Sequence, residues 1–147
     1  MTRFVILMAW FVSFPVYSAE SDAKPFAKQR VILQVSDADP TKYTSTLDIS
    51  NNLIKHYQGP DFIDIEVVAF AKGAQMFFAD DNPNRTRIAS LIDNGVRFYV
   101  CLNTIDTIHR RTGKRPVLLE GVQGVQTGVA LCWRKFSPVL LISILSE

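Results

Sequence analysis

Few side chains in this sequence could carry covalent or metal chemistry. The chain has two cysteines, Cys101 and Cys132, and two histidines, His56 and His109. Two cysteines are too few for a multi-disulfide scaffold or a four-cysteine zinc site, and two histidines exclude a histidine-rich metal centre. We therefore expect no metal site, and the two thiols are the candidates for chemistry.

Cys101 is the more informative thiol because of its place in the sequence. It ends a β-branched stretch, residues 96–101, and a helical pattern over 103–111 follows, for which Asn103 or Thr104 is the expected N-cap. Amides at a helix N-terminus favour an anion and lower the pKa of a thiol placed there. The resulting thiolate is a nucleophile and a sulfur acceptor. The alternative is a buried cysteine at a strand end that packs as a small apolar residue.

Cys132 lies in a segment, residues 127–135, that is expected to be helical, and packing explains it there. A disulfide to Cys101 would suit an oxidising compartment, but sequence alone does not bring the two Cα atoms within the ~4.4–6.8 Å that such a bond requires. That bond would block sulfur chemistry at Cys101 or make the pair a redox switch. His109 lies about two helical turns, roughly 12 Å, beyond Cys101, too far to assist the thiol within one subunit.

Strands that alternate with helices must position these residues. Compact β-branched runs predict strands over residues 30–35, 62–70, 96–101, 116–119 and 139–144. Helical periodicity and its stop residues predict helices over residues 41–58, 85–93, 103–111 and 127–135, with one helical turn at 75–79. This order predicts a three-layer α/β/α fold with an open, mostly parallel, five-stranded sheet. In the second strand the carboxylates come early, so its end near Phe70 is expected to be the more buried.

Composition limits the function classes. The chain has 147 residues, of which 48% are hydrophobic and 20% are charged, and this excludes a collagen, a coiled coil and a disordered tail. The length fits one domain. A net charge of +2 gives no reason to expect a nucleic-acid surface.

The first nineteen residues have the layout of a secretory signal. Arg3 is followed by an uncharged apolar run, residues 4–14, and then by small residues up to Ala19, after which cleavage is expected. Residues 20–29 are expected to form a flexible leader before a single domain over 30–147. This layout predicts a periplasmic or secreted protein that is not stably inserted in a membrane once the signal is cleaved. The alternative is an uncleaved N-terminal anchor.

Ligands of open α/β sheets bind outside the carboxyl ends of the strands. Here those ends are Ser36-Asp37, Lys72-Gly73 and the segment that begins at Cys101. The first of them, SDADP, contains no glycine, which disfavours a dinucleotide cofactor. Three later glycines are interpreted as turn and packing residues: Gly121, Gly124 and Gly128.

Residues 30–131 resemble the DsrE/DsrF-like proteins of sulfur relay and intracellular sulfur oxidation. The resemblance rests on the opening strand and turn VILQVSDADP, the second strand and loop IEVVAFAKGAQ, the segment DNGVRFYVCLNT and the later EGVQGVQTGVA. The Cys-x-Asn-Thr tetrad after Gly-Val-x-Phe is the most specific part.

The resemblance implies a domain that assembles into homo-trimers or homo-hexamers and needs no cofactor. It implies that Cys101 accepts sulfane sulfur from a donor thiol as a persulfide and passes it to an acceptor thiol. Asn103 and Thr104, with the helix amides, would stabilise the thiolate. Three further residues would shape the rim of the substrate pocket: Ser36, Asp37 and Gly73.

Two other function classes stay open. The chain could be a non-catalytic oligomeric domain that binds a small ligand or a protein, or a thiol-redox protein that uses Cys101 and Cys132.

The aromatic group over residues 76–78 is interpreted as core, with an apolar lid or subunit interface as the alternative. Two basic clusters are interpreted as solvated faces, with a surface for an anionic partner as the alternative: Arg85, Arg87, Arg110, Arg111, Lys114 and Arg115.

Overall fold

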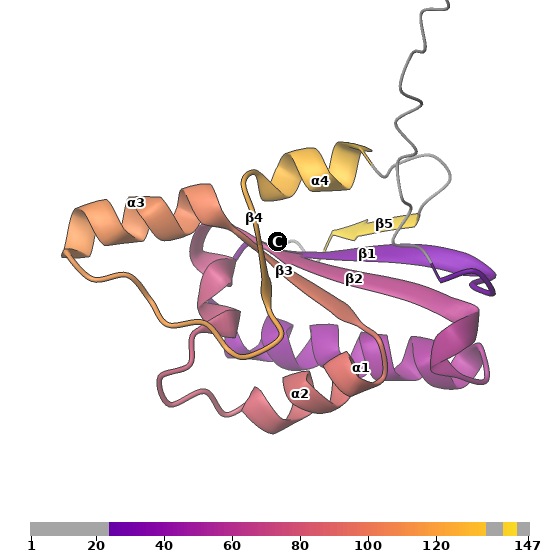
Figure 1. Ribbon diagram of the computed structural model, residues 1–147. Coiled ribbons are helices and arrows are strands. Elements are labelled where there is room, and N and C mark those ends of the chain that lie inside the picture. The colour runs from indigo at the N-terminus through magenta and orange to yellow at the C-terminus, as the bar shows by residue number, and fades with distance from the viewer. Residues whose placement is uncertain (1–23, 135–139, 144–147) are drawn as a thin grey trace, which may run out of the picture.

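A single parallel sheet organises the chain. The computed structural model describes residues 24–134 and 140–143. In these ranges five strands pair in parallel in the order β4-β3-β2-β1-β5 (Figure 1). Their bounds are β1 (Gln29–Val35), β2 (Ile63–Ala69), β3 (Arg97–Cys101), β4 (Gln123–Val125) and β5 (Leu140–Ser143). The predicted five-stranded α/β fold is confirmed.

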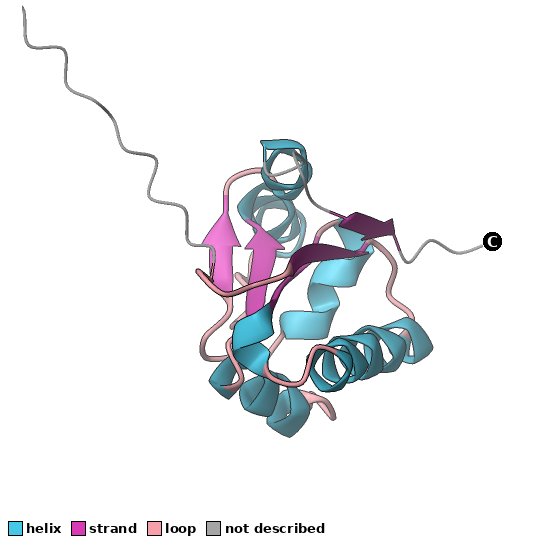
Figure 2. Ribbon diagram, turned by 90° about the vertical axis from the view of Figure 1, so that its right-hand side faces the viewer, coloured by secondary structure: helices cyan, strands magenta, loops and turns pink. Residues whose placement is uncertain are grey.

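Helices cover both faces of this sheet (Figures 1 and 2). The four α-helices are α1 (Pro40–His56), α2 (Arg85–Asp93), α3 (Leu102–Thr112) and α4 (Gly128–Arg134), and the 3-10 segments are η1 (Pro60–Phe62) and η2 (Ala71–Phe77). Helices α1 and α2 lie on one face, and α4 lies over the other (Figure 1). The fold is therefore the expected three-layer arrangement.

The larger core lies between the sheet and the α1–α2 layer. Leu33, Leu47, Phe77 and Phe98 are fully buried there, and the rings of Phe77 and Phe98 meet edge to face at 5.6 Å. The prediction that residues 76–78 belong to the core is confirmed for Met76 and Phe77, which are buried. Met76 and Phe77 end η2, which begins four residues before the predicted single turn at 75–79, and Phe78 follows it in an extended conformation.

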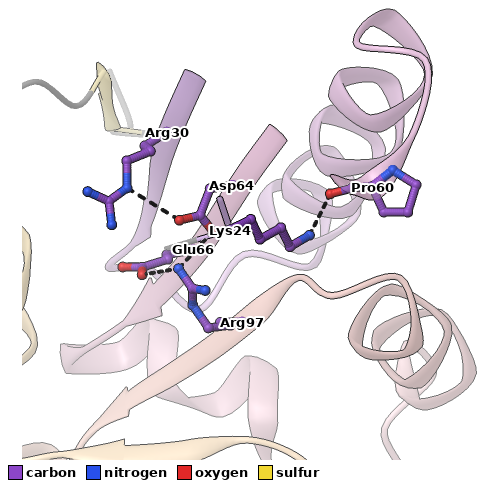
Figure 3. Close-up of polar contacts among 6 residues, drawn as sticks. All are labelled: Lys24, Arg30, Pro60, Asp64, Glu66 and Arg97. Atoms are coloured by element: carbon purple, nitrogen blue, oxygen red, sulfur yellow. Dashed lines mark hydrogen bonds and ion pairs between the residues drawn. The ribbon is translucent and has the colours of Figure 1, made fainter. Parts of the chain in front are cut away.

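Strand β2 is buried along its whole length, not only at its far end. Asp64 and Glu66 are 2% and 4% exposed, respectively. Arg97 of β3 donates hydrogen bonds to both carboxylates, at 2.7 Å and 2.6 Å, and Arg30 of β1 reaches Asp64 at 3.4 Å (Figure 3). Charge pairing across three strands is what allows two carboxylates inside the sheet.

Burial alone would lower the pKa of Arg97, but hydrogen bonds to Glu66 and Asp64 and their negative charges outweigh it and raise that pKa. The guanidinium therefore stays charged. It holds β2 and β3 together on the sheet face that α4 covers, near the start of β3 and away from the carboxyl ends of the strands.

The predicted strand over residues 116–119 is wrong. Those residues form one isolated antiparallel bridge, between Leu118 and Phe78, and the fourth strand is β4, seven residues later. Strand β4 pairs with β3 up to the register of Cys101 and Val125. This shift brings the following segment, residues 126–128, to the end of β3.

The predicted signal over residues 1–19 lies outside the described residues. Of the predicted leader, residues 24–29 are described: Lys24 donates to the Pro60 carbonyl at 2.6 Å and the Lys28 amide to the Phe62 carbonyl at 2.8 Å. Over the described ranges no helix combines the length and apolar character that a membrane span requires.

Candidate functional site

Cys101 stands where β3 passes directly into α3. It is both the last residue of the strand and the N-cap of the helix, with φ −72° and ψ 114°. The prediction of Asn103 or Thr104 as N-cap is wrong, because no loop separates the two elements. Asn103 and Thr104 are instead the second and third helical residues. These are the residues whose amides an N-cap side chain accepts from.

The surroundings of the Cys101 sulfur favour its ionised form. The protonated thiol makes no capping hydrogen bond and donates only a long one, 3.8 Å, to the Gln126 carbonyl. Burial raises the pKa of the thiol, but the donor groups around the sulfur outweigh burial: the Gly128 amide, the Thr104 amide and hydroxyl, and the Asn103 amide. The net pKa is lowered. The arrangement therefore holds a thiolate near neutral pH more readily than a free cysteine does.

Cys101 lies just under the surface. It is 7% exposed, and it lines neither of the two pockets beside it. Gly128, which is buried, lies directly over it: a Cβ at Gly128 would lie 3.4 Å from the Cys101 Cβ and 3.2 Å from a methyl carbon of Val68. The glycine thus lets the start of α4 approach the cysteine closely. Its interpretation as a packing residue is confirmed.

Asn103 connects the start of α3 to the segment that covers Cys101. Its side-chain carbonyl accepts from Gln126 Nε2 at 2.6 Å, its side-chain amide donates to the Thr127 hydroxyl at 3.2 Å, and its backbone amide donates to the Gln126 carbonyl at 3.3 Å. These residues are exposed, so the connection faces solvent. Gln126 and Thr127 were not predicted as site residues, although the glycine spacing and the resemblance over residues 120–130 both marked their segment.

Thr104 connects the same helix turn to the loop after β2. Its hydroxyl accepts a hydrogen bond from the Ala71 amide at 3.1 Å. Ala71 has φ +50°, which is uncommon for a residue with a side chain, and this bond holds it there. A hydroxyl can accept and donate at once, so Thr104 can hold the loop with a lone pair while the same group lowers the pKa of the Cys101 thiol.

Two pockets flank this turn of α3. A pocket of about 510 Å³ lies between the first turns of α3 and the beginning of η2, and Asn103 and Thr104 line it. A second pocket, of about 330 Å³, lies between the end of β4 and α4, with Gln126 and Thr127 in its wall. The predicted site residues Asn103 and Thr104 therefore line a pocket next to Cys101, whereas Cys101 lines neither pocket.

The three predicted rim residues form a separate group at the end of β1. The Gly73 amide donates to the Ser36 carbonyl at 2.9 Å, and a Cβ at Gly73 would lie 2.2 Å from the Val35 carbonyl oxygen. Asp37 accepts from Lys42 at 2.8 Å and from the Ser36 hydroxyl at 3.4 Å. These contacts join the loops after β1 and β2. Neither flanking pocket is lined by Ser36, Asp37 or Gly73, whose role at a substrate rim stays a prediction.

Cys132 is placed apart from this site. It is 1% exposed, in a small cluster between α4 and the sheet. Burial raises the pKa of its thiol, which is only partly offset by a hydrogen bond with Gln34 of β1. Cys101 and Cys132 are both free thiols. Within the described part of the chain, no group of three His, Cys, Asp or Glu side chains could hold a metal ion.

Comparison with known proteins identifies similar structures. No family model and no curated protein matches this chain. A protein of unknown function, MTH1491 from Methanobacterium thermoautotrophicum, matches 78% of this chain and 98% of its own at 26% identity and a TM-score of 0.66. The ychN protein of E. coli matches 79% and 99% at 15% identity and a TM-score of 0.63. Both have the fold of DsrE-like proteins, so the comparison supports the fold that the sequence resemblance implied.

Proposed function

We propose that this chain binds and transfers sulfane sulfur as a persulfide on Cys101. One observation carries the proposal: the sulfur lies at the N-cap of α3, where backbone amides of Asn103, Thr104 and Gly128 and the Thr104 hydroxyl favour its thiolate. The same donors would stabilise the negative charge of a bound persulfide.

The chemical step needs no cofactor. The Cys101 thiolate attacks the terminal sulfur of a donor persulfide R–S–SH, a new S–S bond forms to Sγ, the donor's S–S bond breaks, and R–S⁻ leaves. The products are Cys101–S–SH and the donor thiolate, so atoms and charge balance. Attack of an acceptor thiolate on the outer sulfur of Cys101 reverses the step and releases the sulfur.

Access to the sulfur sets a requirement. Because Cys101 is 7% exposed and its sulfur lies 3.8 Å from the Gln126 carbonyl, a donor reaches it only when the segment over residues 126–128 gives way. The hydrogen bonds that hold this segment to Asn103 are exposed, and exposed hydrogen bonds open at small energetic expense.

The proposal extends to the context of the protein. The apolar N-terminal run predicts export, so donor and acceptor thiols would be sought in the periplasm or outside the cell. A homo-trimer or homo-hexamer is the proposed assembly. Both extensions follow from the sequence and its resemblance.

Intact-mass analysis after incubation with a polysulfide donor tests the function. We expect an adduct of about 32 Da, one sulfur atom, on the wild-type chain. Cys101→Ser abolishes it, and Cys132→Ser, the matched control, retains it. The burial of Cys101 favours a second candidate, a non-catalytic binding domain, for which no adduct forms on either cysteine. A loss of about 2 Da that requires both cysteines would instead identify a redox pair.

A further inference from the structure

The 510 Å³ pocket beside the first turns of α3 has a wall of defined chemistry. One face of the helix supplies Asn103, Thr104, Thr107, Ile108 and Arg111. The opposite wall is the beginning of η2, with Ala71, Lys72 and Gln75. We call this the cationic pocket, because Lys72 and Arg111 are its charged residues and no carboxylate lines it.

Neither cation of this pocket is neutralised by a neighbour. Five other cations in the described ranges are paired with carboxylates: Arg30, Lys42, Arg87, Arg97 and Arg115. Lys72 and Arg111 take part in no ion pair among the described residues, although both line one cavity. Two like charges facing one pocket produce a local positive potential that attracts an anion.

The size and the remaining wall indicate what kind of anion fits. A cavity of about 510 Å³ is in the range that takes small organic molecules. Ala71 and Ile108 offer apolar surface, and Gln75 and Thr107 offer hydrogen-bonding groups that can orient a ligand. A carboxylate-bearing organic molecule uses all of these features, whereas a small inorganic oxyanion uses only the charges.

Thr104 joins this pocket to the proposed sulfur carrier. It lines the pocket, and it is the third residue of the helix that Cys101 caps, where its amide and hydroxyl favour the thiolate. We propose that the cationic pocket binds a carboxylate-bearing, low-molecular-weight organic persulfide as the sulfur donor of Cys101, an inference that rests on the proposed function. Lys72 and Arg111 hold the carboxylates beside Asn103. When the segment over residues 126–128, which Asn103 holds, gives way, the terminal sulfur of the donor passes to the Cys101 thiolate and the donor thiolate leaves.

Equilibrium binding tests the pocket without any transfer. Calorimetry of the full chain with S-methylglutathione, which has two carboxylates and no reactive sulfur, should show saturable binding. Lys72→Gln and Arg111→Gln should each weaken it about tenfold, as the loss of a charge-assisted hydrogen bond does. Lys114→Gln is the matched control, since it removes the same charge from an exposed residue outside the pocket, and it should leave binding unchanged.

Thiosulfate distinguishes the class of ligand in the same assay. Binding of thiosulfate at least about tenfold weaker than that of S-methylglutathione supports an organic ligand. Equal or tighter binding of thiosulfate overturns it, in favour of an inorganic oxyanion site. Absence of S-methylglutathione binding, or binding that Lys72→Gln and Arg111→Gln leave unchanged, also overturns the proposal.

Transfer kinetics separate a failure of the pocket from a failure of the function. Mass spectrometry gives the rates at which glutathione persulfide and the neutral 2-hydroxyethyl persulfide label Cys101, and their ratio should fall about tenfold in Lys72→Gln. Labelling by both donors with an unchanged ratio overturns the pocket and leaves sulfur transfer standing. If neither donor labels Cys101, sulfur transfer is overturned, and the donor role of the ligand with it. Calorimetry then decides separately whether the pocket binds S-methylglutathione.

Discussion

The Thr104 hydroxyl accepts a hydrogen bond from the Ala71 amide at 3.1 Å, and this bond fixes the loop after β2 against the helix that begins at Cys101. The same hydroxyl is among the groups that lower the pKa of the Cys101 thiol. One small side chain therefore joins three features: the thiol, the strained backbone of Ala71 and the wall of the cationic pocket. This connection makes Thr104 the sharpest place at which to perturb the site.

Thr104→Val should raise the pKa of Cys101, because valine keeps the shape of the side chain but removes a hydroxyl that lowers this pKa. Alkylation of Cys101 by iodoacetamide near neutral pH should slow up to about tenfold. Thr104→Ser keeps the hydroxyl and should behave as wild type. Hydrogen exchange of the Ala71 amide reports its hydrogen bond to the Thr104 hydroxyl and should become faster in Thr104→Val alone. An unchanged alkylation profile in folded Thr104→Val would refute the role of the hydroxyl.

The two cysteines should differ in their pH dependence. The pKa of Cys101 is lowered and that of Cys132 is raised, so thiolate forms at Cys101 at the lower pH. Peptide mapping after alkylation across about pH 6 to about pH 10 should show Cys101 modified first. Unfolded chain is the control, in which the two should titrate together. Preferential modification of Cys132 would contradict the assignment.

The lowered pKa of Cys101 also has a consequence for stability. A thiol whose pKa is lower in the folded state contributes stability that is fully present above its unfolded pKa and lost as pH falls through its folded pKa. The free energy of unfolding of wild type, relative to Cys101→Ser, should therefore rise with pH across this window. Urea unfolding at a series of pH values measures the difference, and a flat or falling difference would contradict it.

Most of the sheet and its helices could be predicted from the sequence because their signals are local. The apolar runs that became β1, β2 and β3 were placed within a residue at each end, and helix α2 was placed at residues 85–93, where Asn94-Gly95 stops it. Strand β4 could not be predicted. It is short and contains Gly124, and it pairs with β3 where the Leu102 side chain lies against that glycine, which is a contact between distant segments.

The site was predictable only along its own segment. Cys101, Asn103 and Thr104 are neighbours in sequence, and the strand-to-helix pattern marked them together. Residues 126–128 reach the cysteine from the end of β4, a strand that the sequence did not predict. Ala71 reaches Thr104 from the end of β2, and no spacing in the sequence indicates that contact. Burial of Asp64 and Glu66 was likewise missed, because it depends on Arg97 of the next strand.

Gly73→Ala should destabilise the protein by about 3 kcal/mol, because the new methyl group would meet backbone atoms that cannot rotate away. Its Cβ would lie 2.2 Å from the Val35 carbonyl oxygen and 2.9 Å from the Ser36 nitrogen. Gly113→Ala is the control: that glycine has φ +72° but nothing within 4 Å of a Cβ, so the expected loss is about 1–2 kcal/mol from backbone strain alone. Urea unfolding measures both, and a Gly73→Ala loss no larger than the control would disprove the close contact.

Arg97→Met should destabilise the fold by about 3–5 kcal/mol, because it removes the cation that pairs with Asp64 and Glu66 and leaves two carboxylates in the sheet. Adding Asp64→Asn should recover part of this loss, since the double variant holds one buried charge fewer. Arg87→Met breaks an exposed ion pair with Asp48 and should cost at most about 1 kcal/mol. Chemical denaturation of wild type, Arg97→Met, the double variant and Arg87→Met measures these differences in the free energy of unfolding. If Arg97→Met matches Arg87→Met, the carboxylates are not held by Arg97, and other groups must neutralise them.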